Sequence, residues 1–304
     1  MTATAPLSPD RRATPRGRLR GFLGRFAESR VAAVAALVLA LILALAAFGP
    51  WIAPTNPYDL ASIDILDSRL PPGSQSMDGL TYWLGTDGQG RDILSAILYG
   101  LRVSIVVGLI SGVLALTVGT SLGLMAGYFG GRFDALLMRL VDLQLSFPPI
   151  LVALVLLAVA GRGVEKVILA LAIVQWAYYA RTARSSALVE RGREYMDAAR
   201  GLRLGRATIL FGHLLPNCLS PVIVLATVQI ANSIALEATL SFLGVGLPPT
   251  EPSLGLLISN GFQFALSGNY WVSLFPGLAL VLLIVCINLV SDQVRDVLNP
   301  RLQG

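Results

Sequence analysis

Charged residues are scarce in this chain of 304 residues. Asp, Glu, Lys and Arg together make up 13% of it, about half the share of roughly 25% in a typical soluble domain. Hydrophobic residues make up 55%, and the mean hydropathy is +0.70. A soluble protein of this length needs a polar surface, and too few charges are present to cover one. The composition excludes an ordinary cytosolic enzyme, a disordered protein and a nucleic-acid-binding protein.

Lysine, histidine and cysteine are nearly absent as well. The single lysine, Lys166, does not stand in the Gly-Lys-Ser/Thr run that a phosphate-binding P-loop requires. One histidine (His213) and two cysteines (Cys218 and Cys286) are too few and too scattered for a transition-metal site. We therefore expect no catalytic residue, no metal site and no disulfide, and we interpret both cysteines as small packed residues.

Long apolar runs are what the chain has in place of charge. A membrane-spanning helix needs about 20 mostly apolar residues, and six runs approach this length, which predicts an all-α integral membrane protein with six transmembrane helices. The first run has about 18 residues, longer than the core of a cleaved signal peptide, which favours a retained anchor. The fourth is short, and Arg181 and Arg184 could lengthen it by reaching the polar interface. The runs are 31–48, 103–126, 136–160, 167–181, 219–243 and 271–290.

Basic residues are unequally distributed between the predicted loops. With the N-terminus in the cytoplasm, 18 of the 23 lysines and arginines fall on the cytoplasmic side. The positive-inside rule therefore predicts that both termini are cytoplasmic. The predicted segments are an Arg-rich tail (1–30), a first helix (31–48), a periplasmic loop (50–99), a core of five helices (100–290) with a cytoplasmic loop at 185–217, and a cytoplasmic tail (291–304).

Glycine and proline recur inside the predicted spans. Small residues let membrane helices approach closely, so glycines spaced four apart predict close packing of the second span. Two consecutive prolines, Pro148 and Pro149, predict a kink in the third span. The spaced glycines are Gly108, Gly112, Gly119, Gly123 and Gly127.

Two acidic residues lie within predicted spans. Asp142 follows Arg139 by three residues, a spacing that favours an ion pair on one helix face. Glu237 has no basic residue within one turn, and a carboxyl group in a membrane needs a partner or a water-filled cavity. Two interpretations of Glu237 stay open: a structural hydrogen-bond anchor, or a residue lining a pathway.

The run at 87–92 could be mistaken for a calcium loop. It lacks the twelve-residue spacing and the terminal Glu of an EF-hand. We predict a tight turn before a helix instead.

The most informative segment is the predicted cytoplasmic loop. Residues 193–204 form a cationic helical pattern with small residues at Ala198 and Ala199, and a turn is expected near Gly205. A second amphipathic stretch follows and stops at Pro216. This pattern indicates a docking surface for a soluble partner, with a solvated linker helix as the alternative.

This loop resembles the EAA loop of binding-protein-dependent ABC importers. Asp-Ala-Ala at 197–199 matches the Glu-Ala-Ala triplet, and His-Leu-Leu-Pro-Asn at 213–217 resembles the ending in the dipeptide, oligopeptide and nickel branch. One departure is Arg203, which stands where that pattern has glycine. The resemblance assigns to the ATPase-coupling loop Glu194, Asp197, Ala198, Ala199, Gly201, Arg203, Gly205, His213 and Pro216.

Further blocks resemble the C-type permease subunit of the same branch. They occur in the same order along the chain, at 82–92, 127–131, 138–148, 237–244 and 288–301. Leu254 departs from the tryptophan that relatives usually carry there. The resemblance implies the type I permease fold of ABC importers, located in a bacterial inner membrane.

The resemblance also implies partners and a mechanism. A second, homologous permease would complete the pathway, two ATPase chains would bind ATP and Mg²⁺, and an outside solute-binding protein would deliver the solute. This chain itself would be a transport subunit without enzymatic activity or a cofactor of its own. Closure of the ATPase domains would push the coupling helix, with Asp197 offering a carboxylate to a partner arginine or backbone amide.

Several alternatives remain at this point. His213 is interpreted as a residue that bonds the loop end, with a proton relay as the alternative. The rival functions are a secondary transporter working without an ATPase and a membrane scaffold that does not transport. The sequence does not distinguish peptides, glutathione-like molecules, nickel chelates and other solutes.

Overall fold

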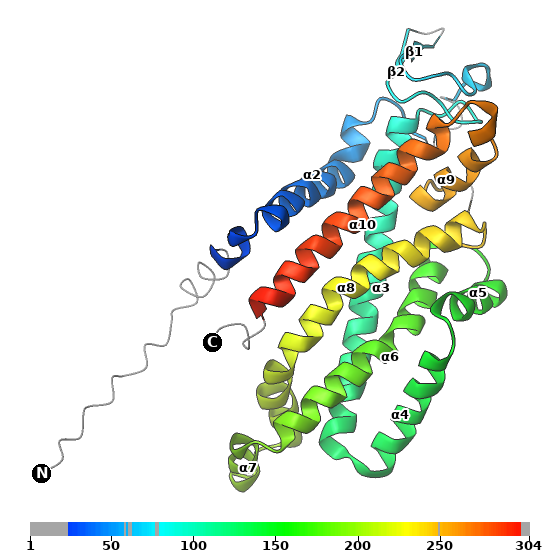
Figure 1. Ribbon diagram of the computed structural model, residues 1–304. Coiled ribbons are helices and arrows are strands. Elements are labelled where there is room, and N and C mark those ends of the chain that lie inside the picture. The colour runs from blue at the N-terminus through cyan, green and yellow to red at the C-terminus, as the bar shows by residue number, and fades with distance from the viewer. Residues whose placement is uncertain (1–23, 58, 60–62, 77–78, 249, 299–304) are drawn as a thin grey trace, which may run out of the picture.

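Long helices form the body of the molecule (Figure 1). The computed structural model describes residues 24–57, 59, 63–76, 79–248 and 250–298. The predicted tail up to residue 23 and the last six residues of the predicted C-terminal tail lie outside the described residues. Four described helices are long and apolar enough to cross a membrane, and one bent pair makes a fifth candidate span. The all-α prediction is confirmed, with one small hairpin of β1 (Ser74–Gln75) and β2 (Thr81–Tyr82) added.

Helix α2 (Arg30–Ile52) confirms the first predicted span. The Oγ of Ser29 caps it by accepting a hydrogen bond of 3.3 Å from the backbone nitrogen of Ala32. The helix packs along α10 (Trp271–Leu298), which contains the sixth predicted span. Gln293 Nε2 also donates to the carbonyl oxygen of Arg25 at 3.2 Å. The two described ends of the chain therefore lie together.

Helix α3 (Ile93–Phe129) runs through the centre of the bundle and begins earlier than the predicted second span. Its start is fixed by Asp92, whose Oδ2 accepts from the backbone nitrogen of Ser95 at 2.8 Å. The helix packs most extensively against α6 (Val164–Arg191). A Cβ added at Gly127 would lie only 2.6 Å from the Cβ of Ala187. The predicted close packing through glycine is thus confirmed.

The third predicted span is two helices and not one kinked helix. Helix α4 (Gly131–Ser146) and helix α5 (Pro149–Ala160) meet at an angle of 93°. Pro148 is extended between them, with φ of −56° and ψ of 129°. A residue that precedes proline avoids the helical region, so Pro149 forces this break at Pro148. The location of the predicted kink was right, and its sharpness was underestimated.

Two ion pairs hold α4 against α6. Asp134 accepts from Arg184 at both carboxylate oxygens, at 2.5 and 2.6 Å. Asp142 pairs with Arg181 of α6. The predicted pair of Asp142 with Arg139 on the same helix was therefore wrong, because α4 folds back along α6 and offers Asp142 a partner from another helix.

The predicted cytoplasmic loop is largely helical. Helix α6 continues to Arg191, helix α7 spans Glu194–Gly201, and a π-helix, η3 (Thr208–Leu214), follows. Helix η3 runs without interruption into α8 (Leu215–Phe242), so that 35 residues form one continuous helix. Pro221 lies inside α8, near its loop end.

The remaining elements complete the bundle. Helix α9 (Leu254–Phe262), which was not predicted, packs against α8 and α10. Two 3₁₀ turns occur at Ile65–Asp67 and Ala265–Ser267. Helix α6 is long enough to span a membrane but is less apolar than the helices counted above. The six-span count and the side of the termini therefore stay predictions.

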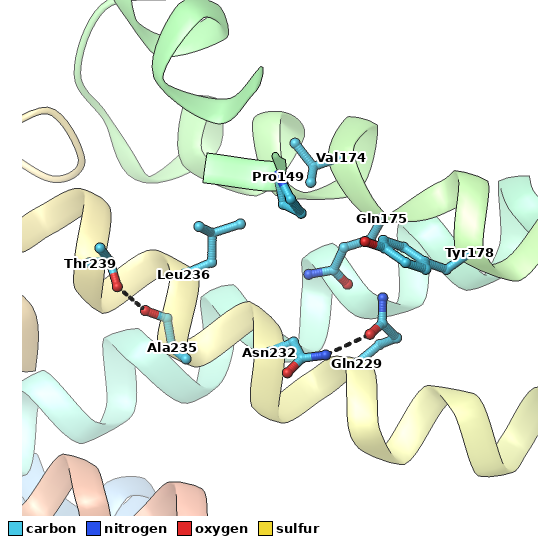
Figure 2. A pocket seen from close by; sticks show the side chains of 9 residues that line it. All are labelled: Pro149, Val174, Gln175, Tyr178, Gln229, Asn232, Ala235, Leu236 and Thr239. Carbon is cyan, nitrogen blue, oxygen red and sulfur yellow. Dashed lines mark hydrogen bonds between the residues drawn. The ribbon is translucent and has the colours of Figure 1, made fainter. Parts of the chain in front are cut away.

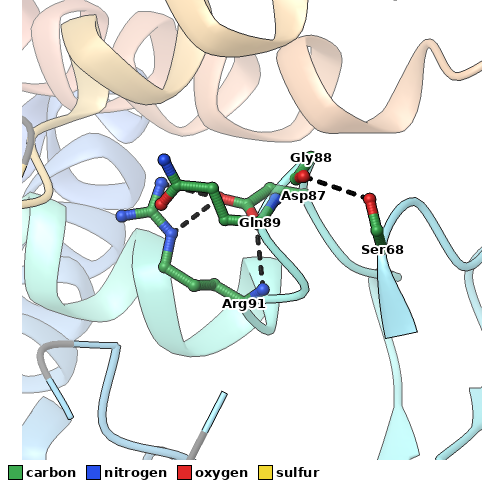
Figure 3. A network of polar contacts seen from close by, with 5 residues as sticks. All are labelled: Ser68, Asp87, Gly88, Gln89 and Arg91. Atoms are coloured by element: carbon green, nitrogen blue, oxygen red, sulfur yellow. Dashed lines mark hydrogen bonds and ion pairs between the residues drawn. The ribbon is translucent and has the colours of Figure 1, made fainter. Parts of the chain in front are cut away.

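The turn before α3 is built around one carboxylate. Figure 3 shows Asp87 accepting at Oδ1 from the backbone nitrogens of Gln89 and Arg91, at 2.8 and 3.0 Å. Arg91 Nε donates to Asp87 Oδ2 at 2.7 Å, and both side chains are buried. Ser68 donates to the carbonyl oxygen of Gly88 at 3.1 Å. The predicted tight turn is confirmed, and the Asp87 carboxylate forms an ion pair with Arg91.

Candidate functional site

The segment from α7 to η3 lies at the end of the bundle opposite the hairpin (Figure 1). Its inner side is apolar: Met196 and Ala199 of α7 are buried against Ile209, Leu210 and Leu214 of η3 and the ends of α3 and α6. Burial of these side chains holds the segment on the bundle. The position of α7 is therefore fixed by its inner face, which leaves the outer face free to carry function.

Polar contacts fix the start of α7. The hydroxyl of Tyr195 donates to Glu190 Oε2 at 2.8 Å, and Arg193 Nε lies 3.2 Å from Glu190 Oε1. Burial raises the pKa of Tyr195 to about 12, with the hydrogen bond to Glu190 contributing further. The phenol therefore remains a protonated donor at neutral pH, and Glu190 ties α6 to α7.

The outer face of α7, defined here as Asp197, Ala198, Gly201 and Leu202, is exposed. The Leu202 side chain is 75% exposed. Asp197 contacts Arg200 on the same helix, at 3.0 Å. Because an ion pair at the surface contributes little, the Asp197 carboxylate is available to a partner.

The structure separates the two alanines of the triplet. Ala198 is exposed, whereas Ala199 is buried at 3%. Successive residues of a helix point about 100° apart, and this rotation carries Ala199 to the inner face of α7. The small-residue face expected from the sequence thus consists of Ala198 and Gly201, while Ala199 packs inward. Glu194 is also exposed, in the first turn of α7, where a negative charge is favourable.

Helix α7 ends in a left-handed residue at the unusual Arg203, which has φ of +52°. Leu204 N donates to the carbonyl oxygen of Ala199 at 3.3 Å, and Arg203 N donates to that of Arg200 at 2.9 Å. This pair of bonds is a Schellman motif, which usually has glycine at the left-handed position. The turn that ends the first helix of the loop is therefore centred on Arg203, two residues before Gly205.

Arg203→Gly is expected to stabilise the chain by about 1 kcal/mol, because a left-handed conformation penalises residues with a Cβ. Thermal unfolding of the purified chain in detergent measures the change. Gly205→Ala is the matched control and is expected to be close to neutral, since Gly205 is not among the described residues with positive φ. A lower melting temperature for Arg203→Gly would contradict this account of the helix end.

The end of the loop is held by hydrogen bonds. His213 Nδ1 lies 3.1 Å from the carbonyl oxygen of Thr208, so the imidazole donates from Nδ1. Asn217 Nδ2 donates to the carbonyl oxygen of His213 at 2.7 Å. Pro216 lies at the junction of η3 with α8, where it cannot donate a backbone hydrogen bond. These contacts support the structural interpretation of His213.

Glu237 lies on α8, away from the coupling loop, and is completely buried. Its Oε2 accepts from Ser104 of α3 at 2.7 Å, and its Oε1 accepts from Ser241 at 2.8 Å. The carboxyl group therefore joins two helices that are far apart in the sequence. This geometry supports the anchor interpretation of Glu237.

The sequence alone did not single out two kinds of residue. Leu202, on the outer face of α7, is large, apolar and exposed; its signal was that it falls outside the buried stripe of the loop. Gln175, Gln229 and Asn232 lie together between α6 and α8. The sequence signal that could have identified them is the presence of polar amide side chains within predicted spans that are otherwise apolar.

Two family models match the chain. Residues 119–304 match the model described as binding-protein-dependent transport system inner membrane component. Residues 17–72 match the N-terminal TM domain of oligopeptide transport permease C. The first match covers more than half of the chain.

Curated relatives match along nearly the whole chain. The dipeptide transport system permease protein DppC of Escherichia coli K12 is 39% identical over 304 residues, covering 100% of this chain and 97% of the relative. The di/tripeptide transport system permease protein DppC of Pseudomonas aeruginosa is 37% identical, covering 94% and 93%.

A solved structure has a similar fold. An inward-facing structure of the MetNI methionine ABC transporter matches with a TM-score of 0.53 and 20% identity, covering 66% of this chain and 96% of that one. At this identity the match concerns the fold, which is that of a type I permease. Together with the family models, it shows that this chain belongs to the inner membrane components of binding-protein-dependent transport systems, the permeases of ABC importers.

Proposed function

We propose that this permease forms half of a translocation pathway for peptides and is driven through the outer face of α7 by separate ATPase chains. The complete importer would contain a second, homologous permease, two ATPase subunits that bind ATP and Mg²⁺, and a solute-binding protein outside the membrane. This chain would supply no catalytic residue. The relatives named as dipeptide and di/tripeptide permeases support the substrate class.

The observation that carries the coupling role is the two-sidedness of α7. Its inner face is buried in the bundle, while its outer face combines a carboxylate, small residues and an exposed leucine. Small side chains permit close approach by another protein, and Asp197 can accept charge-assisted hydrogen bonds. A surface of this kind suits a groove on a soluble partner better than it suits water.

Coupling requires more than contact. ATP can shift the permease between two conformations only if the ATPase partner binds α7 differently in its two states. A helix that is fixed to the bundle on one side and bound on the other can pass such a difference on to α6 and α8. A secondary transporter would have no use for this surface, and family membership argues against that alternative.

The test is co-purification of the chain from native membranes in mild detergent. We expect a second permease and P-loop ATPases to accompany the wild type, and Asp197→Lys to lose the ATPases while keeping the second permease. Asp296→Lys, which reverses an exposed charge on α10, is the matched control and should keep all partners. The proposal fails if the chain purifies alone and moves labelled peptide into vesicles without ATP.

A further inference from the structure

A cavity of about 350 Å³ lies between α5, α6 and α8. Figure 2 shows Gln175 and Tyr178 of α6 across the cavity from Gln229 and Asn232 of α8. Its volume lies within the range of small-molecule sites, roughly 300–1,000 Å³. The described side chains that line it carry three amides and two hydroxyl groups and no charge.

The amides are linked but not fully bonded. Gln175 Nε2 donates to Ser233 Oγ at 2.6 Å, and Ser233 Oγ donates to the carbonyl oxygen of Gln229 at 3.0 Å. Asn232 Nδ2 donates to Gln229 Oε1 at 2.7 Å. Gln175 is only 3% exposed, yet its Oε1 has no hydrogen-bond partner within the described part of the chain. One buried acceptor is thus held in place and left unused.

Such an arrangement is unfavourable if nothing else binds there. A buried acceptor without a partner is destabilising because its hydrogen bonds with water are lost, and polar side chains inside a membrane usually face a bundle interior or a water-filled cavity. Asn232 and Thr239 nevertheless lie exposed on one side of α8, seven residues apart, where a lipid-facing helix would carry apolar residues. The cavity therefore has the chemistry of a wet pathway and not of a lipid contact.

We propose that this cavity is a solute subsite of the pathway and that it binds the amide backbone of a short peptide. A peptide group has one N–H donor and one carbonyl acceptor, and the side-chain amides of Gln175, Gln229 and Asn232 offer both complements. Gln175 Oε1 is shielded in this conformation and would accept from the peptide N–H when α6 and α8 move apart during transport. This inference rests on the proposed peptide function and adds the residues that contact the solute.

Neutral amides also suit the task of a permease. They bond the group that all peptides share and impose no charge on side chains or termini, so that selection by sequence is left to another component. A neutral site also binds weakly enough to release its solute. The subsite thus distinguishes peptides from solutes that lack a backbone N–H.

The first test compares two solutes in cells whose only peptide importer contains this chain. Labelled alanyl-alanine has a backbone N–H, and alanyl-sarcosine has a methyl group in its place. We expect Gln175→Leu to slow uptake of alanyl-alanine about tenfold, the factor for one buried hydrogen bond, and to leave alanyl-sarcosine unchanged. Asn232→Leu, at an exposed position, should also lower the ratio of the alanyl-alanine uptake rate to the alanyl-sarcosine uptake rate. Because the solute-binding protein is identical in every strain, a changed ratio is assigned to the permease.

A control variant completes this test. Thr117→Val removes an exposed hydroxyl on α3 that bonds only its own helix, and it should leave both rates unchanged. In one outcome, the wild type accumulates alanyl-alanine while both Leu variants keep the wild-type ratio of the two uptake rates. That result overturns this inference and leaves the peptide function standing. If the wild type accumulates neither peptide while its complex is assembled, the peptide function fails and this inference with it.

A second test needs no transport. In the assembled complex, Asn232→Cys is expected to react with a charged, water-soluble thiol reagent, since only a hydrated thiol ionises, and excess alanyl-alanine should slow the reaction severalfold. Leu169→Cys, on the exposed apolar surface of α6, should stay unreactive. The native cysteines are both buried and would be replaced by alanine in both variants. An unreactive Asn232→Cys overturns the subsite.

Discussion

Gly123→Ala is expected to lower the free energy of unfolding by about 3 kcal/mol, the upper end of the usual range for overpacking. A Cβ at Gly123 would lie 2.9 Å from the Cα of Ala180 and would overlap its carbonyl oxygen. Because both groups are backbone, no rotamer change relieves the contact, and α3 and α6 must move apart. Thermal unfolding in detergent and the yield of the assembled complex measure the effect.

Gly112→Ala is the matched control on the same helix. Its added Cβ would meet the Ile230 Cγ1 at 3.4 Å, an ordinary contact with a side-chain atom. Both substitutions gain the same helix propensity, about 1 kcal/mol, so their difference isolates packing. Equal stability of the two variants would show that α3 and α6 are not as close as described.

Glu237→Ala is expected to destabilise the chain by about 3 kcal/mol. The substitution removes the acceptor of Ser104 and Ser241, both completely buried, and leaves a cavity at the junction of α3 and α8. Unfolding in detergent again measures the loss. Retention of wild-type stability would mean that the two hydroxyls find other acceptors at no cost.

Glu237→Gln separates the two interpretations of this residue. The amide keeps one acceptor and adds a donor, and a serine hydroxyl can turn to accept, so we expect stability close to that of the wild type. If Glu237 is an anchor, peptide uptake by this variant should also persist. Normal stability with abolished uptake would favour a role in the pathway instead.

The sequence predicted most helices because hydropathy is a local property. The runs at 31–48 and 271–290 lie within single helices, and the run at 219–243 extends one residue beyond α8. The start of α3 was missed because Arg102 interrupts the apolar run, although the preceding turns are buried. Hydropathy predicts which segments contact lipid. The first turns of α3 are covered by other parts of the protein, so hydropathy does not detect them.

The features that were wrong or missed depend on contacts between helices. Asp142 pairs with Arg181 because of a 93° bend whose angle no local pattern encodes. The burial of Ala199 depends on how α7 rotates against η3. The cavity combines amides of two helices more than 50 residues apart, as in the bond from Gln175 to Ser233. The coupling residues were predicted from the family resemblance, since the pattern alone indicated only a docking surface.

The continuous helix of η3 and α8 has a mechanical consequence. Its 35 residues form a rod about 52 Å long, with the coupling loop at one end and the cavity amides on its flank. Pro221 removes one backbone donor and is the natural pivot. Asn232 lies about 16 Å along the rod from this pivot, so a bend of about 10° would carry it about 3 Å, the width of a water molecule. Under the proposed function, a small push on the loop would bend this helix and so open or close the proposed path.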